Sequence, residues 1–152
     1  MAPTEFLCTK RAYADFVLRI DCKLTANCNA GIQIRSHRLP ASSVVCALCG
    51  YQADMSGSGG FWGSLMDEYR RGKLPADKKE KVRAVVKHND WNQYEIRCIG
   101  PRIQLFVNGV KTRDYIEKDE AIVLTGLIGL QRHGGNVPRE VRYRKIEIAE
   151  LP

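Results

Sequence analysis

The chain has 152 residues, enough for one domain with a single core, and its shares of hydrophobic (44%) and charged (27%) residues point to neither disorder nor a coiled coil. No apolar run approaches the roughly 20 residues that span a bilayer, and the first ten residues lack the pattern of a signal peptide, so neither a membrane span nor an export signal is expected. The net charge of +7 allows an anionic partner, but the basic residues are scattered and no aromatic-and-basic strand motif accompanies them, so nucleic-acid binding is not favoured.

The N-terminal half predicts a series of strands. Residues 6–10 form an apolar strand that could serve as a sheet edge, and residues 15–24 alternate apolar and polar side chains, which is typical of a half-buried antiparallel strand. Residues 31–35 repeat this pattern and place Gln33 and Arg35 on one polar face. The Ser- and Gly-rich residues 56–60 predict a flexible loop.

Two tight turns organise the C-terminal half. Gly100-Pro101 separates a strand at 91–99 from one at 102–107, and Asn108-Gly109 leads into a third strand at 110–116. The last strands are expected at 123–131 and 140–151, and the one plausible helix at 76–87. Many short strands with turns between them predict an all-β sandwich or barrel. Its core should include Phe16, Leu18, Ile20, Ile103 and Leu105.

The six cysteines permit three disulfides in an exported protein, so the sequence leaves their pairing open. Cys8, Cys22, Cys46 and Cys98 lie in apolar strand-like runs and are expected to be free, buried thiols. Cys46 and Cys49 have the spacing of zinc ligands, but no second pair completes a tetrahedral site, so no zinc centre is predicted.

A series of co-linear motifs carries a family resemblance. They read NAGIQIR at 29–35, GYQAD at 50–54, GSLMDEYRR at 63–71, WN at 91–92, VNG at 107–109 and GLQRHGG at 129–135. In this order they resemble the 3-keto-disaccharide hydrolase domain family, from about residue 6 to residue 151. The resemblance implies one domain over residues 1–152, a concanavalin-like jelly-roll β-sandwich of two antiparallel sheets. It also implies action on glycosides whose sugar is oxidised at carbon 3.

The chain departs from the family pattern in three places. It lacks the family's usual N-terminal segment before residues 6–10, so that sheet edge is expected to be exposed or covered by a second copy in a homodimer. Many members have Glu at the position of Gln52 and Tyr at the position of Met66. These two differences bear on catalysis more than on the fold.

The implied chemistry needs a base, a group that stabilises an enolate and an acid. Oxidation at carbon 3 acidifies the carbon 2 proton, so a base removes it, the glycosidic oxygen leaves carbon 1, and water then adds. His133 is expected to be the base, because histidine is the residue type best suited to exchange protons near neutral pH and this one precedes two glycines at a strand end. Asp54 shares a strand face with Gln52, and Glu68 is preferred to its neighbour Asp67 as the further acidic group. The predicted catalytic residues are His133, Asp54 and Glu68.

Further residues are expected to bind the sugar. Arg35 and Arg71 offer permanent charge, Gln52 and Gln131 offer amides, and Tyr51 and Trp62 offer rings for stacking.

Several alternatives stay open. Asp54 could cap the loop at 56–60, His133 could bond its own turn, and both could join Glu68 in holding a divalent cation. The predicted function is a hydrolase or lyase that cleaves 3-keto-glycosides. The alternative is a carbohydrate-binding module without catalysis, since folds of this kind host both roles.

Overall fold

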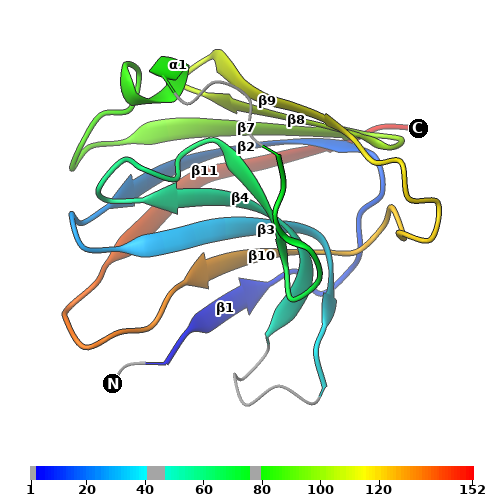
Figure 1. Cartoon of the computed structure of the whole chain (residues 1–152), viewed down its shortest axis with the longest axis horizontal. Coiled ribbons are helices and arrows are strands. Elements are labelled where there is room, and N and C mark those ends of the chain that lie inside the picture. Colours follow the sequence, from blue (N-terminus) through cyan, green and yellow to red (C-terminus); the bar gives the residue numbers. More distant parts are fainter. Residues whose placement is uncertain (1–2, 41–46, 76–79) are drawn as a thin grey trace.

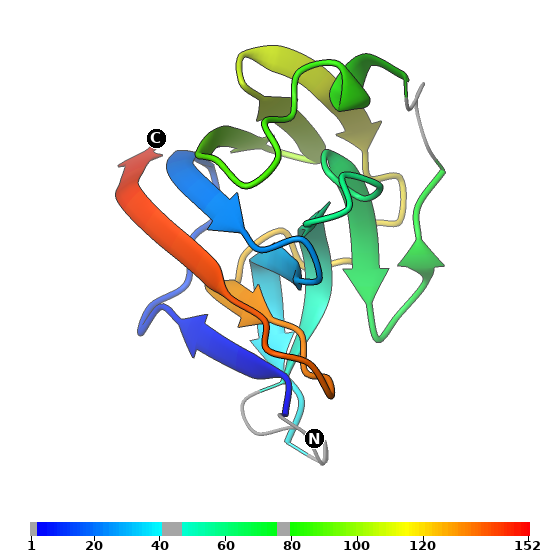
Figure 2. The same ribbon diagram turned by 90° about the vertical axis from the view of Figure 1, so that its left-hand side faces the viewer.

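The computed structural model describes residues 3–40, 47–75 and 80–152, which form two antiparallel β-sheets packed face to face (Figure 1, Figure 2). One sheet has the strand order β1-β10-β3-β4-β5-β6 and the other the order β11-β2-β7-β8-β9. The all-β jelly-roll prediction is therefore confirmed. The elements are β1 (Glu5–Cys8), β2 (Phe16–Leu24), β3 (Asn29–Arg38), β4 (Leu48–Ser56), β5 (Ser64–Glu68), β6 (Gly72–Lys73), α1 (Glu80–Arg83), β7 (Asn92–Ile99), β8 (Arg102–Val107), β9 (Val110–Ile116), β10 (Leu127–Arg132) and β11 (Val141–Glu150).

The hydrophobic core lies between the sheets and follows from the period-two pattern. Successive strand residues point to opposite faces, so every second residue of β2 and β8 meets the other sheet. Burying an aliphatic or aromatic side chain in this way stabilises a fold by roughly 1.5–3 kcal/mol. The five predicted core residues are all buried, at most 1% exposed: Phe16, Leu18, Ile20, Ile103 and Leu105.

The hairpin from β8 to β9 shows why Asn-Gly was informative. Asn108 and Gly109 have φ angles of 49° and 81°, the left-handed conformation that a tight two-residue hairpin requires. The Asn108 side chain also accepts a hydrogen bond from the backbone N–H of Gln93 at 2.9 Å and donates one to the carbonyl of Val85 at 2.7 Å. The predicted meander of three strands, β7, β8 and β9, is confirmed.

The predicted helix at 76–87 is longer than the one observed. Residues 76–79 lie outside the described residues, α1 covers only Glu80–Arg83, and a turn follows it. The side chain of Asn92 accepts from the backbone N–H of Lys87 at 2.7 Å and donates to its carbonyl at 2.8 Å. Because Asn92 satisfies both groups, the backbone at Lys87 needs no helical partner.

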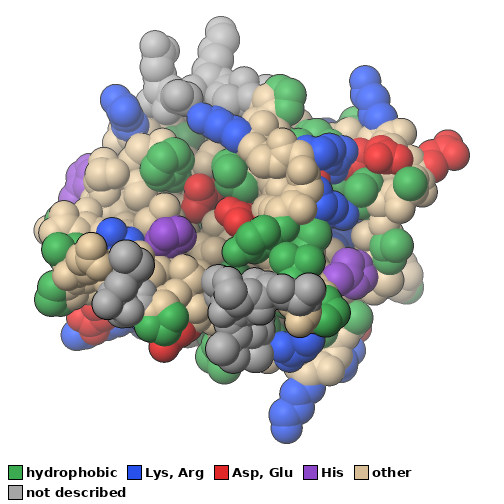
Figure 3. Space-filling model, turned by 60° about the horizontal axis from the view of Figure 1, so that its bottom comes forward, with side chains coloured by type: hydrophobic (Ala, Val, Ile, Leu, Met, Phe, Trp, Pro, Cys, Tyr) green, Lys and Arg blue, Asp and Glu red, His purple; other side chains and the backbone are tan. Residues whose placement is uncertain are grey.

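Among the described residues, β1 forms one edge of the six-stranded sheet and pairs with β10 alone. The expected strand at 6–10 appears one residue earlier as β1, at that edge, with the side chain of Leu7 73% exposed. The homodimer across this edge stays a prediction. On the face seen in Figure 3 the Lys and Arg side chains are dispersed rather than gathered into one patch. No described helix is long and apolar enough to cross a membrane.

The described cysteines behave mainly as small core residues. Cys22, Cys28 and Cys98 are buried with free thiols, and Cys49 is a half-buried free thiol. Burial raises the pKa of the Cys98 thiol to about 12, which makes it a poor nucleophile. The prediction of buried thiols is confirmed for Cys22 and Cys98, Cys8 is half-buried, and Cys46 lies outside the described residues.

Candidate functional site

The face of the six-stranded sheet opposite the core carries a group of polar side chains. Residues paired across antiparallel strands point to the same face, and Gln52 pairs directly with Gln33. Asp54 lies two residues further along β4 and so shares this face. The same register places Glu68 of β5 and Gln131 of β10 on this face. This surface, called the polar face below, carries Gln33, Gln52, Asp54, Glu68 and Gln131.

A chain of hydrogen bonds orders the polar face, and Gly31 makes room for it. A Cβ atom at Gly31 would lie 2.3 Å from Cδ of Gln52, so only glycine lets the Gln52 side chain lie here. Ser36 Oγ donates to Gln33 Oε1 at 2.7 Å, and Gln33 Nε2 donates to Gln52 Oε1 at 2.8 Å. Gln52 Nε2 then donates to Asp54 Oδ1 at 3.2 Å. Each amide is thereby oriented, and the chain ends at a carboxylate.

Asp54 is a buried carboxyl whose protonation changes near neutral pH. Asp54 is only 6% exposed, and this burial raises the pKa of its carboxyl from 3.8 to about 7. The hydrogen bonds from Gln52 and from the backbone N–H of Met55 oppose that shift, while the charge of Glu68 adds to it. Among the described residues none donates a hydrogen bond to Oδ2. A group of this kind can both give and take a proton at working pH.

Glu68 interacts through charge with Asp54 and also with His133. Burial raises the pKa of Glu68, and the charge of His133 lowers it. His133 follows β10, is exposed, and has its Nδ1 2.9 Å from the carbonyl oxygen of Gly134. Because a carbonyl can only accept, this contact places the proton of the neutral ring on Nδ1 and leaves Nε2 able to take one.

Arg35, expected among the sugar ligands, is directed away from the polar face. A β-bulge between Ile34 and His37 interrupts the alternation, and Arg35 takes a φ of 48° within it. The side chain is 0% exposed and points into the structure. It donates to the carbonyls of Ala14 (2.8 Å) and Gly100 (2.6 Å) and pairs with Asp15 (2.9 Å). This contact set occupies its guanidinium, so the expectation that Arg35 binds sugar is not supported.

Tyr51 and Arg71 join a separate network at one end of the core. Tyr51 lies between Gly50 and Gln52 in the strand, so it faces inward, and its hydroxyl donates to Glu117. Arg71 pairs with Asp67 and with Glu117, each at 2.6 Å. The hydrogen bond from Arg71 lowers the pKa of Glu117, and burial raises that of Tyr51. The structure does not bring either residue to the polar face, and Asp67 is buried and pairs with both Arg70 and Arg71.

Trp62 is also part of the interior. Its ring stacks on Tyr94 with 5.6 Å between centroids, and its Nε1 donates to the carbonyl of Ser56 at 2.9 Å. A buried, stacked indole offers no open face to a sugar in this structure, unlike the ring that the sequence led us to expect.

The divalent cation considered from the sequence does not find its ligands here. Within residues 3–40, 47–75 and 80–152, no three His, Cys, Asp or Glu side chains come together as a metal-binding group. Glu68 interacts through charge with Asp54 and with His133, but the three side chains are not gathered as ligands of one ion.

Gln33 and Ser36 belong to the polar face but were not singled out as site residues from the sequence. The alternation of residues 31–35 placed Gln33 on a polar face, and its direct pairing with Gln52 would have identified it. Ser36 gave no such signal, because it joins the face only through the bulge. Lys73 was likewise missed; it pairs with Met66 across β5 and β6, and its charge lowers the pKa of Asp54.

Comparisons with known proteins agree with this architecture. The model of the 3-keto-alpha-glucoside-1,2-lyase-like domain matches residues 2–149, and no curated protein matches the sequence. Among solved structures, a protein described as a candidate glycosyl hydrolase from Parabacteroides distasonis has a TM-score of 0.69 at 18% identity, covering 95% of this chain and 76% of its own. The carbohydrate-binding module CBM66 from Bacillus subtilis has a TM-score of 0.67 at 12% identity, covering 97% and 83%. The galectin LEC-6 from Caenorhabditis elegans has a TM-score of 0.55 at 15% identity, covering 96% and 90%. At these identities the solved structures establish the fold.

Proposed function

The chain belongs to the carbohydrate-related family of 3-keto-alpha-glucoside-1,2-lyase-like domains, and from that premise we propose that it cleaves 3-keto-glycosides by elimination followed by hydration. The observation that carries the proposal is Asp54, a buried carboxyl with a pKa of about 7 on the polar face. Glu68 interacts through charge with Asp54 and with His133. Acid-base catalysis is most effective when such groups titrate near the working pH.

In the first step of the proposed reaction, His133 Nε2 removes the proton on carbon 2. Its Nδ1–H is held by the Gly134 carbonyl, so Nε2 carries the free electron pair. The electrons of the broken C–H bond move toward the ketone and form an enolate. Gln131, on the polar face and 4% exposed, would offer an amide N–H to the enolate oxygen.

In the second step the enolate collapses and the bond from carbon 1 to the glycosidic oxygen breaks. Protonated Asp54 would give its proton to the leaving oxygen and become a carboxylate. Water then adds across the new double bond, with hydroxide to carbon 1 and a proton to carbon 2, so the net change is hydrolysis. Glu68 would steady the imidazolium that forms on His133, since the two already interact through charge.

The experiment supplies the purified protein with a 3-keto-glycoside and with its unoxidised parent and measures release of the leaving alcohol. Only the ketone should react, because without it the carbon 2 proton is far too weakly acidic for a side-chain base. Asp54→Asn, Glu68→Gln and His133→Ala should each lower the rate by roughly 10²-fold or more. His88→Ala is the matched control, because His88 is also exposed with Nδ1 against a backbone carbonyl.

A second candidate, a carbohydrate-binding module without catalysis, is favoured by the ordered amides of Gln33 and Gln52, which could hold sugar hydroxyls without chemistry. CBM66 and LEC-6, whose names describe sugar binders, share the fold. Binding with no product from either substrate form would support this candidate. Equal cleavage of both forms would instead indicate ordinary glycoside hydrolysis by two carboxyl groups.

A further inference from the structure

Glu117, which was not singled out from the sequence, binds side chains of the six-stranded sheet from the end of β9 in the other sheet. It directly follows β9 and is 7% exposed. Arg71, in the turn between β5 and β6, donates to both of its carboxylate oxygens, at 3.1 Å and 2.6 Å. Tyr51 of β4 donates to it through its hydroxyl, and so does Tyr115 at 3.1 Å. Glu117 therefore links β4 and the turn after β5 to the opposite sheet.

Asp67 extends this set of contacts along β5. Arg71 donates to one of its carboxylate oxygens at 2.6 Å, and Arg70 donates to the other at 2.6 Å. Asp67 is fully buried, so the two arginines compensate a charge that is removed from solvent. Charge-assisted hydrogen bonds that arginine makes through two N–H groups at once fix the geometry of both partners. Tyr51, Asp67, Arg71 and Glu117 are called the Glu117 network below.

The strand residues of the Glu117 network are direct neighbours of polar-face residues. Tyr51 precedes Gln52 in β4. Asp67 precedes Glu68 in β5, and it pairs with Tyr51 across the two strands. Successive strand residues point to opposite faces, so an inward contact at Tyr51 or Asp67 fixes the backbone from which the next side chain leaves on the polar face. The network thereby determines where Gln52 and Glu68 start.

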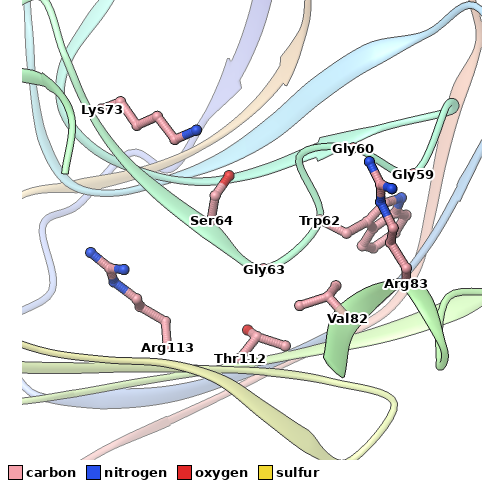
Figure 4. Close-up of a pocket in the computed structure, with 10 residues that line it drawn as sticks. All are labelled: Gly59, Gly60, Trp62, Gly63, Ser64, Lys73, Val82, Arg83, Thr112 and Arg113. Carbon is pink, nitrogen blue, oxygen red and sulfur yellow. The ribbon is translucent and has the colours of Figure 1, made fainter. Parts of the chain in front are cut away.

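The sheet edge that carries Glu68 has limited packing of its own. Among the described residues β6 is the edge strand, and its two residues pair with Met66 and Asp67 of β5. A pocket of about 40 Å³ lies between this edge and β9, with Ser64 and Lys73 on one side and Thr112 on the other (Figure 4). Side chains beside such a space make fewer van der Waals contacts than side chains in the core. Hydrogen bonds of the Glu117 network therefore contribute strongly to the position of this edge.

The side chains that leave this part of the sheet on the polar face act on Asp54. The charge of Glu68 raises the pKa of Asp54, and the charge of Lys73 lowers it. Gln52 donates to the Asp54 carboxylate at 3.2 Å. Interactions between charges weaken as their separation grows. A shift of β5 and β6 relative to β4 would therefore change the environment of the Asp54 carboxyl.

We propose that Glu117 is a positioning residue of the polar face, which keeps Glu68 in its place relative to Asp54 by binding Arg71 and Tyr51. This inference rests on the proposed function for the catalytic role of the polar face. Glu117 binds Tyr51 on the core side of the sheet, so it acts through the strands and not by contact with the substrate.

The test measures how strongly Glu68 acts on Asp54 with and without the Glu117 network. An NMR titration of the Asp54 carboxyl carbon, assigned by its absence from Asp54→Asn, gives the pKa of Asp54 in each protein. In the wild-type background, Glu68→Gln should lower the pKa of Asp54 because it removes a nearby negative charge. In the Glu117→Gln background the same change should lower it by less than half as much, because Arg71 has lost a charged partner.

Asp114→Asn is the matched control. Asp114 lies in β9 and also binds an arginine through two hydrogen bonds, from Arg102 at 2.7 Å and 2.8 Å, but outside the Glu117 network. Glu68→Gln should keep its full effect on Asp54 in that background. Glu117→Asp, which retains the charge, should keep more of the effect than Glu117→Gln.

A full effect of Glu68→Gln in the Glu117→Gln background would overturn the proposal. An equal loss of the effect in the Asp114→Asn background would also overturn it, because any change near β9 would then suffice. If Glu117→Gln does not fold, Tyr51→Phe replaces it, since it removes only the hydroxyl that binds Glu117. A full effect in Tyr51→Phe would then contradict the proposal, and a reduced effect would support it.

The cleavage rate of a 3-keto-glycoside gives a second readout and separates this inference from the proposed function. Glu117→Gln should lower kcat by roughly tenfold or more while changing KM less, because misplaced groups slow the chemical step. A reduced effect of Glu68 on Asp54 in a protein that cleaves no 3-keto-glycoside would support the positioning role and contradict the reaction. Cleavage by the wild type with an undiminished effect in Glu117→Gln would support the reaction and contradict the positioning role.

Discussion

Replacing Asp54 by Asn should make the fold more stable at alkaline pH while lowering the cleavage rate by roughly 10²-fold or more. The Asp54 carboxyl is buried, and burial raises its pKa from 3.8 to about 7. Above pH 7 the wild-type protein must hold a charge in a poorly solvated place, whereas the unfolded chain exposes that charge to water. An amide of the same shape has no charge to bury.

The size of the effect follows from the two pKa values. A difference of about three pH units, at about 1.4 kcal/mol each, means that ionised Asp54 destabilises the fold by about 4 kcal/mol above pH 7. The sign is that of a raised carboxyl pKa: the contribution to stability is fully present below pH 3.8 and is lost as the pH rises toward 7. The free energy of unfolding of the variant should therefore rise progressively relative to that of the wild type across this range, by about 2–3 kcal/mol between pH 5 and pH 8. Hydrogen bonds that the variant loses change the difference in the free energy of unfolding by the same amount at every pH. They therefore do not alter how that difference depends on pH.

Urea unfolding of both proteins at several pH values between 5 and 8 measures this difference directly. Asp114→Asn is the control without pH dependence in this range, because the hydrogen bond from Arg102 lowers the pKa of Asp114 and its carboxyl is ionised in both the folded and the unfolded chain above pH 5. The difference in the free energy of unfolding between that variant and the wild type should stay constant as the pH rises through this range. A difference between Asp54→Asn and wild type that is the same at pH 5 and pH 8 would refute the raised pKa and, with it, the main support for acid-base chemistry.

Two further changes test the framework of the site. Arg35→Ala should lower the free energy of unfolding by about 3 kcal/mol or more, because it leaves Asp15 and two carbonyls without their donor; a loss no larger than that of the exposed Arg102→Ala, in the same urea experiment, would contradict this. Gly31→Ala should push the Gln52 side chain from its place, since the new Cβ would lie 2.3 Å from it, and should lower the cleavage rate by roughly tenfold; full activity would show that the orientation of Gln52 is dispensable.

The fold was predictable because its signals are local. Period-two alternation identified β2, and Asn108-Gly109 identified the hairpin between β8 and β9. The helix at 76–87 was overestimated, because Asn92, five residues after Lys87, satisfies the Lys87 backbone with its side chain, and hydrophobic periodicity does not reveal such a contact. Helix propensity was overridden there by a local hydrogen bond between a side chain and the backbone.

The site was predictable only where alternation is regular. Gln52 and Asp54 share a face because β4 is uninterrupted between them, and the same alternation, applied strictly, would have assigned Tyr51 to the core. The predicted orientation of Arg35 was wrong for a different reason. A bulge in β3 reverses its direction, and bulges depend on local twist and partner strands rather than on a pattern in one strand.

The destabilisation caused by ionised Asp54 helps to distinguish a catalytic role from simple sugar binding. A sugar-binding site needs hydrogen bonds, and a neutral amide at residue 54 would supply them without a penalty of about 4 kcal/mol at alkaline pH. The chain already has amides beside it, in Gln33 and Gln52, arranged so that they donate toward the carboxyl. A buried carboxyl is useful where its proton is used, because the burial that destabilises the fold also brings its pKa to about 7. Retaining an acid where an amide would be more stable favours proton transfer over simple binding as the role of the polar face.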